Sequence, residues 1–274
     1  MAEIVVQSVI GLEITKDYIY AALLEMEGSV IHLKKVKSIA IPPHSLVNGQ
    51  VTEPNMLAEL VSKNLADDNF SYDYVIAAVN DINFLKELDL IPHIPGKDIL
   101  IELEMKIAKH FHFQQSDFQL GYQVFRENQP GDSNTAVKQA VLYAAMKSDT
   151  IDSLTELIND MGTKMLTVDL VPLAALRTMT IGADFKDEVT IYSFIDSTYM
   201  DINFIYKGHV IFSHVFPKDM RDIIDEEYLL EAYLNTYRHC YIQCTNLFPN
   251  LAKASKIIYS TRIPHIQLFF EKLK

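Results

Sequence analysis

The sequence predicts a two-domain α/β protein, and three observations support this prediction. The chain has 274 residues, which corresponds to roughly two domains of ordinary size. Hydrophobic residues make up 49% of it and charged residues only 22%, so the chain can form a sizeable core. A pattern of three strands, a helix and a further strand occurs near each end. A duplication of this size predicts two similar halves with a cleft between them.

The first repeat opens with alternating apolar and polar residues, as in half-buried strands. We expect three strands, Ile4–Glu13, Tyr18–Glu25 and Val30–Ile41, joined by short polar turns. A helix from Pro54 to Ala66 follows, because proline favours the first helical turn and the apolar residues then share one face. The nearly all-apolar segment Tyr74–Val79 is typical of a strand buried on both faces.

The middle of the chain, residues 80–170, has the pattern of a small inserted subdomain. Ile99, Leu103 and Ile107 recur at helical spacing, which predicts a helix that begins near Pro95 and ends near Phe111. The whole segment reads β-α-β-β-α-β. Its other expected elements are the strands Phe84–Ile91, Phe118–Phe125, Ala136–Met146 and Met165–Leu170, and a helix from Ser148 to Met161.

The second repeat follows a short helix, Pro172–Met179, and a polar hinge at 184–187. Its expected elements are the strands Val189–Asp196, Asp201–Tyr206 and His209–Phe216, the helix Glu226–Asn246, the strand Ile257–Ser260 and a final helix from Pro264. We therefore expect a first domain of residues 1–79 completed by 171–183, and a second domain of 188–274. Two such halves describe the actin-like fold, the ribonuclease H-like (ASKHA) architecture that actin shares with heat-shock chaperones and sugar kinases.

Composition and charge exclude several classes of protein. The formal charge is 24 − 36 = −12, which argues against general nucleic-acid binding, because that affinity comes mainly from lysine and arginine. Cys240 and Cys244 stand four residues apart in an expected helix, so we predict free thiols and a reducing compartment. No signal peptide and no apolar run of about 20 residues is visible. A membrane contact would therefore come through a partner.

Several segments, in the order in which they occur, resemble motifs of one family. They are Gly11–Thr15 after the first strand, Val47–Pro54 before the first helix, Glu104 and Lys109–Phe113, Asp117–Phe125, Met161–Asp169 with Pro172–Arg177, and Phe194–Thr198 after the first strand of the second repeat. Together they resemble the PilM-like, actin-related proteins of type IV pilus assembly, which are close to the division protein FtsA.

This resemblance implies a function without catalysis and without a catalytic residue. Members of the family are cytoplasmic scaffolds, peripheral at the inner membrane, which bind the N-terminal tail of a PilN-like bitopic inner-membrane protein in a groove beside the insert. They also communicate with the platform protein and the motor ATPases, and they can form a ring or another homo-oligomer. For the groove, Phe84, Leu85, Leu103 and Ile107 are the apolar candidates; the alternative is that they form the core of the insert.

Nucleotide binding is expected to be weak or lost. Actin-like folds hold ATP in tight turns where glycine lets backbone N–H groups approach the phosphates, and this chain has only 9 glycines. Thr15, Ser197 and the turn Ser260–Arg262 occupy the three expected glycine positions. Glu13 and Asp196 are candidates to hold hydrated Mg²⁺, and Lys16 to contact phosphate. The degenerate nucleotide turns thus comprise Glu13, Thr15, Lys16, Asp196, Ser197 and Thr198.

Other candidates carry a structural and a functional interpretation. His110 and His112 lack an identifiable third ligand, so no metal site is predicted. The link 217–227 is too short for the further subdomain that relatives carry there, and its acidic residues suit a solvated loop or a basic partner. The helix after it carries tyrosines that suit either the core or a contact with a neighbouring subunit: Tyr228, Tyr233, Tyr237 and Tyr241.

Two alternative functions stay open at this point. One is the cytoplasmic component of a type II secretion or MSHA-type pilus system, in which the same fold is often fused to a membrane helix. The other is an ATP-dependent enzyme of the sugar-kinase type, which intact glycine turns and a catalytic aspartate would favour. The chain stops one helix after its last expected strand, so it is either a minimal member of the family or part of a longer protein.

Overall fold

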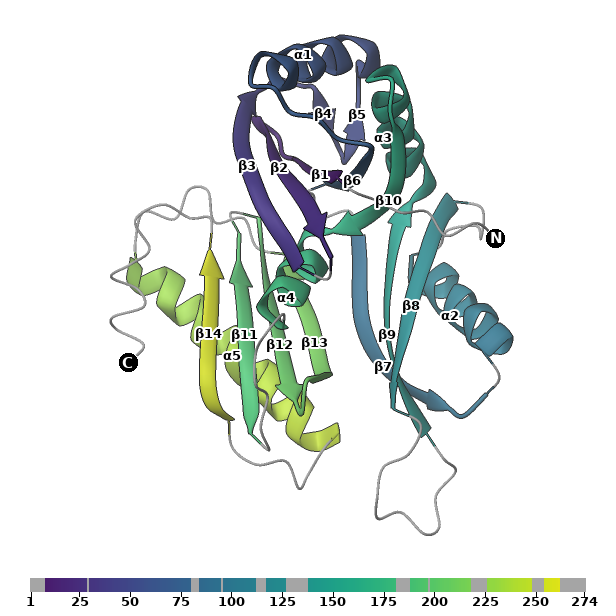
Figure 1. Ribbon diagram of the computed structural model, residues 1–274. Helices are drawn as coiled ribbons and strands as arrows, with labels where there is room; N and C mark the ends of the chain where they lie inside the picture. The colour runs from purple at the N-terminus through teal and green to yellow at the C-terminus, as the bar shows by residue number, and fades with distance from the viewer. Residues whose placement is uncertain are drawn as a thin grey trace. The chain divides into compact units, whose positions relative to one another are not determined.

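The structure is a computed structural model that describes residues 8–28, 30–79, 84–94, 96–111, 117–126, 138–180, 188–196, 198–217, 226–247 and 254–261. These residues fall into two compact units (Figure 1). Unit 1 comprises residues 1–84, 116–119 and 146–174, and unit 2 comprises 85–115, 120–145 and 175–274. The helix α4 (Val171–Thr180) contributes residues to both.

Unit 1 is built on a five-stranded sheet with the strand order β10-β6-β1-β2-β3. Its strands are β1 (Ser8–Ile14), β2 (Tyr18–Glu27), β3 (Val30–Ala40), β6 (Tyr74–Val79) and β10 (Lys164–Leu170). The first three are antiparallel neighbours, whereas β6 runs parallel to both β1 and β10. The first predicted meander is therefore confirmed.

Two helices contribute to the core of unit 1. The helix α1 (Pro54–Asp67) buries Leu57 and Val61, and α3 (Ser148–Asp160) buries Leu154 and Ile158 in the same hydrophobic cluster. The hairpin of β4 (Leu46–Val47) and β5 (Gln50–Val51) joins them, and the amide of Val51 donates to Ser153 Oγ on α3 (3.2 Å). Its turn residues Asn48 and Gly49 have φ values of 50° and 81°, as a tight type I′ hairpin requires.

The pairing in unit 1 changes the expected extent of the insert. We expected 148–170 to belong to the inserted subdomain, but β10 pairs with β6 along its length and α3 packs in the core of unit 1. The physical reason is that the apolar face of α3 requires burial and the edge of β6 requires a partner strand. The segment 148–170 meets both requirements, because α3 packs in this core and β10 pairs with β6. The other expected domain limits, 1–79 with 171–183 and 188–274, stay predictions.

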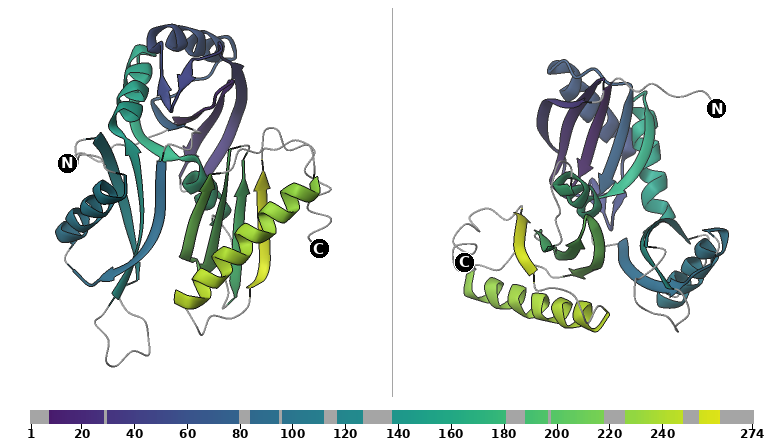
Figure 2. Two further views of the ribbon diagram at one scale, coloured as in Figure 1. Left: turned by 180° about the vertical axis from the view of Figure 1, so that it is seen from behind. Right: turned by 60° about the horizontal axis from the view of Figure 1, so that its bottom comes forward.

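Unit 2 contains a seven-stranded sheet with the order β14-β11-β12-β13-β7-β9-β8. Its second-repeat part consists of β11 (Val189–Ile195), β12 (Tyr199–Tyr206), β13 (His209–Pro217), β14 (Ala254–Thr261) and the helix α5 (Glu226–Leu247). The helix covers one face of these strands, as Figure 2 shows, and it contacts β12 and β13. The second meander is confirmed, with β12 beginning two residues earlier than predicted.

The rest of the sheet comes from the middle of the chain: β7 (Phe84–Pro92), β8 (Phe118–Arg126) and β9 (Lys138–Lys147), with α2 (Gly96–Phe111). These strands and this helix match the elements predicted for the first part of the insert, whereas the insert as a separate subdomain stays a prediction. Their sheet continues that of the second meander, although β7 meets β13 at a single residue pair, Glu87 with His214. The expected loop at 127–135, the hinge at 184–187 and the final helix from Pro264 lie outside the described residues.

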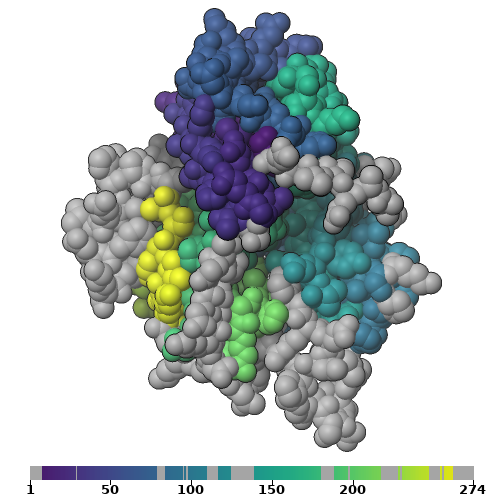
Figure 3. Space-filling view, viewed as in Figure 1, coloured from purple at the N-terminus to yellow at the C-terminus, as the bar shows by residue number. Residues whose placement is uncertain are grey.

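The two meanders differ in burial. All seven residues of β11 and seven of the eight in β12 are buried. In unit 1, by contrast, Tyr18 and Tyr20 on β2 are 44% and 43% exposed, and Val36 on β3 is 69% exposed. In the space-filling view the purple residues of this first meander lie at the surface (Figure 3). One copy of the repeat is thus buried on both faces, while the other keeps an exposed apolar face.

Candidate functional site

The turns after β1 and β11 are the expected nucleotide turns. Each contains the same backbone hydrogen bond, which allows the two sequences to be aligned residue by residue. In unit 1 the amide of Thr15 donates to the carbonyl of Tyr18 (2.9 Å), and in unit 2 the amide of Asp196 donates to the carbonyl of Tyr199 (2.9 Å). Thr15 therefore corresponds to Asp196. By the same count Glu13 corresponds to Phe194, so the two carboxylates proposed for magnesium do not occupy equivalent positions.

The side chain of Thr15 closes the first turn on itself. Its hydroxyl donates to the carbonyl of Tyr18 (2.8 Å) and accepts from the amide of Tyr18 (3.0 Å). A glycine at this position would leave that amide available, since it has no side chain to bond with. The threonine hydroxyl thus occupies a backbone donor of the kind that actin-like turns offer to phosphate.

The remaining candidates of the two turns lie in different environments. Glu13 is half-buried and Lys16 is exposed in unit 1. In unit 2 Asp196 is buried, Thr198 is half-buried, and Ser197 lies outside the described residues. Because β14 pairs in parallel with β11, with Thr261 beside Ile195, the end of β14 lies at the same sheet edge as Asp196. The roles of these residues in nucleotide binding stay predictions.

A buried ion pair in unit 2 was not predicted from the sequence. The side chains of Lys86 on β7 and Asp201 on β12 are 0% exposed, and Lys86 Nζ lies 2.6 Å and 2.7 Å from the two carboxylate oxygens. Lys86 also donates to Asn203 Oδ1 (3.0 Å), while Asn203 Nδ2 donates to Asp201 and Ser213 donates to Asn203. Both carboxylate oxygens of Asp201 thus accept hydrogen bonds from buried side chains.

Burial dominates the electrostatics of this cluster. Desolvation lowers the pKa of Lys86, and the charge of Asp201 opposes that shift. Desolvation also lowers the pKa of His214, which faces Glu87, His239, Asp201 and Lys86. A single lysine in a strand of alternating polar and apolar residues usually lies in solvent. The sequence around Lys86 therefore does not predict its burial, which depends on Asp201, 115 residues away.

The insert contains a pocket of about 450 Å³ between β7, α2 and β9. We call it the insert pocket; its lining residues are Leu85, Glu87, Asp89, Lys106, Ile107, Lys109 and Tyr143. The Tyr143 hydroxyl donates to Glu87 (2.7 Å) and lies 3.2 Å from Asp89, and Lys106 pairs with Asp89 (2.7 Å). Burial and these carboxylates raise the pKa of Tyr143, so it stays a neutral donor.

The four apolar residues predicted for partner binding divide between pocket and core. Leu85 and Ile107 line the insert pocket, although Ile107 is only 1% exposed. Leu103 is 0% exposed and forms part of the core of the insert, while Phe84 is half-buried. The spacing of the apolar residues predicts the helix, whereas the part that charged residues play in the pocket was not predicted.

The tyrosines of α5 mainly pack inside unit 2. Tyr233 is 1% exposed and donates or accepts with Ser193 (2.9 Å), while Tyr237 and Tyr241 lie beside Phe204 with ring centroids 6.4 Å away. Only Tyr228, 49% exposed, remains suited to a neighbouring subunit among these four. The predicted thiols are free and buried, and burial raises the pKa of Cys240 and of Cys244 to about 12.

Two features bear on metals and membranes. Within the described ranges, no three His, Cys, Asp or Glu side chains are grouped so that they could hold a metal ion. His112 and the acidic link before α5 are outside those ranges. Among the helices in the part of the chain that the structure describes, none has the length and apolarity needed to cross a membrane.

No protein-family model matches the chain, and no curated protein matches it. Among solved structures, a chain of the PilM–PilN type IV pilus biogenesis complex is similar, with a TM-score of 0.67 and 18% identity over 89% of this chain and 72% of that one. A protein of Bacteroides thetaiotaomicron with an actin-like ATPase fold and unknown function is also similar, with a TM-score of 0.56 and 11% identity over 98% and 87% of the two chains.

The cytoplasmic domain of EpsL, an inner-membrane component of the type II secretion system of Vibrio cholerae, matches with a TM-score of 0.49 and 8% identity over 94% of this chain and 84% of that one. The two higher-scoring structures show the fold: this chain has the actin-like α/β fold that the sequence and its resemblance to PilM-like proteins predict.

Proposed function

We propose that this chain is a non-catalytic, actin-like scaffold of a type IV pilus or related assembly machine. In this role it binds the N-terminal cytoplasmic tail of a PilN-like inner-membrane protein, which holds it at the membrane. The observation that carries the proposal is the fold likeness, across 89% of the chain, to a component of the PilM–PilN complex. The family motifs that occur in order along the sequence support it.

The insert pocket is our candidate for the tail-binding site. Leu85 and Ile107 provide an apolar wall, and Lys106 and Lys109 from α2 with Glu87 and Asp89 from β7 provide charges of both signs. An extended peptide is recognised by such a combination, because apolar side chains anchor it and charged groups fix its direction. Lys109 is exposed at the pocket and is therefore the charge most accessible to a partner.

The proposed scaffold does not depend on ATP hydrolysis. The Thr15 hydroxyl accepts a hydrogen bond from the Tyr18 amide, and Lys86 forms an ion pair with Asp201. Within the described residues, the glycines with positive φ serve hairpins and helix ends rather than these turns; they are Gly28, Gly49, Gly162 and Gly208. We propose that ATP–Mg²⁺ binding is weak or lost. Contacts with a platform protein and motor ATPases, and assembly into a ring, are further parts of this proposal.

A binding measurement with a neighbouring membrane protein tests the proposal. The cytoplasmic tail of a bitopic protein encoded beside this chain, made as a peptide, is expected to retain the protein in a pull-down. Lys109→Glu should weaken retention at least tenfold, because it reverses a charge at the pocket. Lys63→Glu, which makes the same change on exposed α1, is the matched control. Failure of every such tail to bind, or an equal loss in both variants, contradicts the proposal.

A further inference from the structure

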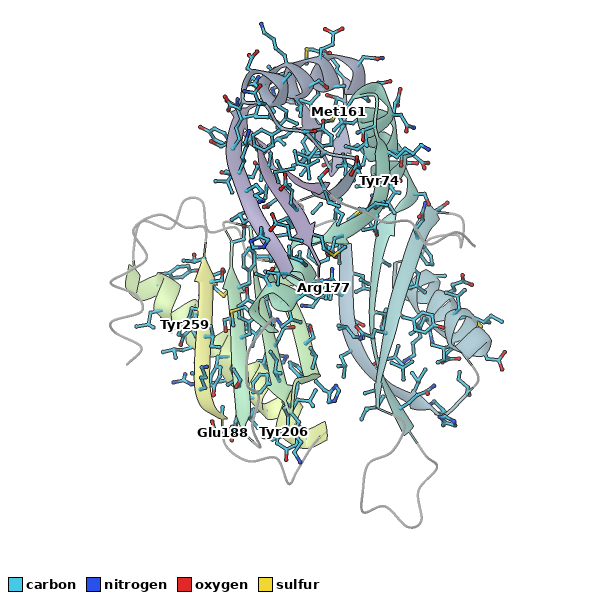
Figure 4. All side chains as sticks on the ribbon, viewed as in Figure 1. Tyr74, Met161, Arg177, Glu188, Tyr206 and Tyr259 are labelled. Carbon is cyan, nitrogen blue, oxygen red and sulfur yellow. The ribbon has the colours of Figure 1, made fainter. Side chains whose placement is uncertain are left out.

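The edge of the sheet in unit 1 is formed by β3, a strand of 11 residues. It pairs with β2 along its length, and within the part of the chain that the structure describes no strand pairs with its other side. In Figure 4 β3 lies at the left side of unit 1, while Tyr74, labelled at the start of β6, lies toward the other side. Such an edge presents a row of backbone N–H and C=O groups that can pair with a further strand.

A bulge in β3 gathers its apolar residues on one face. Leu33 and Val36 stand opposite Leu24 and Ala22 of β2, and Lys34 is the extra residue between the two pairs. In a regular strand, positions 33 and 36 would point to opposite faces, but the extra residue brings them to the same one. The paired positions of β2 alternate with its core residues, so this face points away from the core.

This outer face carries a group of exposed apolar side chains, which we call the β3 patch. On β3 they are Ile31 (62% exposed), Leu33 (62%) and Val36 (69%), and on the neighbouring β2 they are Tyr18, Tyr20 and Met26. Single exposed apolar residues are ordinary, whereas a contiguous group of them marks an interaction surface. An edge strand can be protected by charged residues and a bulge, and neither device requires such a patch beside it.

The second repeat shows how the equivalent edge is used. The third strand of its meander is β13, which corresponds to β3, and the outer side of β13 faces the antiparallel strand β7. The two meet at the pair His214–Glu87, and β7 comes from a distant part of the chain. The third strand of this repeat thus accommodates an added antiparallel strand in unit 2. This observation favours the same mode of binding at β3, with the strand supplied by another molecule.

The charge of β3 indicates which kind of strand would bind. It contains Lys34, Lys35 and Lys37 and no acidic residue, in a chain with 36 acidic and 24 basic residues. An added strand would lie about 4.8 Å from β3, and about twice as far from Glu25 and Glu27 of β2, with which Lys34 pairs. Opposite charges on neighbouring strands stabilise a sheet and like charges destabilise it. A second copy of β3 is therefore disfavoured, because it would bring three further lysines to this edge.

We propose that the edge of β3 binds an extended segment of a protein partner in which apolar and acidic residues alternate. The main chain of the segment bonds to β3, its apolar side chains cover the β3 patch, and its carboxylates lie on the other face, near Lys35 and Lys37. Each of these two lysines donates to two oxygens of unit 1 and has a third N–H for a partner. The proposal does not rest on tail binding, because β3 belongs to unit 1 and the insert pocket to unit 2.

Short peptides test the proposal on the full chain. Acetyl-Glu-Val-Glu-Val-Glu-amide is the probe, and acetyl-Lys-Val-Lys-Val-Lys-amide is the probe of opposite charge. Hydrogen exchange of the backbone amides is measured segment by segment as each peptide is titrated. With the acidic peptide we expect saturable slowing of exchange, by about threefold or more, in residues 30–40 and no slowing in 199–217. Equal slowing with both peptides, or no slowing in 30–40, overturns the proposal.

Variants connect this binding with the β3 patch. Leu33→Glu should weaken the acidic peptide about tenfold, because it removes an apolar contact and adds a like charge. Ile242→Glu, the same kind of change at a residue of α5 that is 59% exposed, should leave the affinity within about twofold. Val36→Thr keeps a residue that favours strands and should weaken binding about threefold, so the test stands even where Leu33→Glu does not fold. Unchanged affinity in Val36→Thr contradicts the proposal.

Two other occupants of this edge are distinguished by separate measurements. Sedimentation equilibrium of the protein alone tests for a second copy, and flotation with phosphatidylglycerol vesicles tests for a lipid surface. We expect neither self-association nor flotation that depends on the β3 patch. A dimer that Leu33→Glu dissociates, or vesicle binding that Leu33→Glu abolishes, overturns the proposal.

Discussion

The two meanders of this chain have the same strand order and the same closing hydrogen bond in their first turn, yet they differ in chemistry. Aligned from that bond, Tyr20 on β2 corresponds to Asp201 on β12, and Ala22 corresponds to Asn203. Tyr20 is 43% exposed, whereas Asp201 and Asn203 are fully buried and bonded to Lys86. The backbone of the repeat is therefore retained while the two faces of its sheet have been adapted to different surroundings.

The comparison also shows how different side chains stand in turns of the same backbone geometry. In unit 1 a threonine hydroxyl bonds to the backbone amide of the turn, and in unit 2 a buried aspartate stands at the equivalent position. The turn geometry persists because the closing bond is a backbone bond and depends little on the side chain. Phosphate binding, which needs free amides and glycine, does not follow from that geometry alone.

The largest effect should come from breaking the buried ion pair of unit 2. Lys86→Ala leaves Asp201 buried without its cation, which should lower the free energy of unfolding by about 3–5 kcal/mol. Urea denaturation followed by circular dichroism measures it. Lys34→Ala, which removes an exposed ion pair of the first meander, should produce no measurable change.

Replacing both charged groups sharpens this prediction. Lys86→Met combined with Asp201→Leu removes both charges together, so we expect stability within about 1–2 kcal/mol of the wild type. The remaining loss of stability reflects the hydrogen bonds that Asn203 makes to Lys86 and Asp201 and that this double variant removes. A double variant as unstable as Lys86→Ala would show that hydrogen bonding, rather than the uncompensated charge, holds this face together.

A smaller effect is expected at the first turn. Thr15→Gly removes two hydrogen bonds and adds backbone freedom in the unfolded chain, which should cost about 1–2 kcal/mol. ATP–Mg²⁺ binding should not appear, because the second turn still lacks glycine. Thermal unfolding and calorimetric titration check the two parts; sub-millimolar ATP affinity in this variant would contradict the account of the turns.

The exposed face of β2 in unit 1 should tolerate an aspartate at position 20, which is equivalent to the buried Asp201 of β12. Tyr20→Asp introduces at β2 the side chain found at the equivalent position of β12, and it should cost about 1 kcal/mol or less, from lost strand propensity and the ring contact with Tyr18. Asp201→Tyr should prevent folding or destabilise far more. Equal losses in denaturation would show that the two faces are equivalently buried.

The smallest effect concerns pH. Burial lowers the pKa of His214 below 6.5, so the unfolded chain binds this proton more readily than the folded one. Its contribution to stability is complete above pH 6.5 and is lost as the pH falls through the folded pKa. His214→Gln should flatten the dependence of the urea midpoint on pH between 5 and 7, and an unchanged dependence would contradict this account.

The sequence predicted the elements well because their signals are local. Alternation, the Pro54 helix start and the glycine-containing turns place the strands and helices within a few residues of those observed. It did not predict which elements share a sheet: β10 returns to β6, and β7 continues from β13. These pairings, like the Lys86–Asp201 pair, join residues far apart in sequence, and no pattern within one strand encodes them. Leu85 and Ile107 were identified, but not the charged half of their pocket.

The most direct test of the scaffold account is a calorimetric titration of the partner's tail peptide into the protein, with and without ATP–Mg²⁺. The account predicts saturable binding of the peptide with the same affinity in both conditions, and its loss in Lys109→Glu. Binding that requires ATP–Mg²⁺, or no binding in either condition, would contradict it.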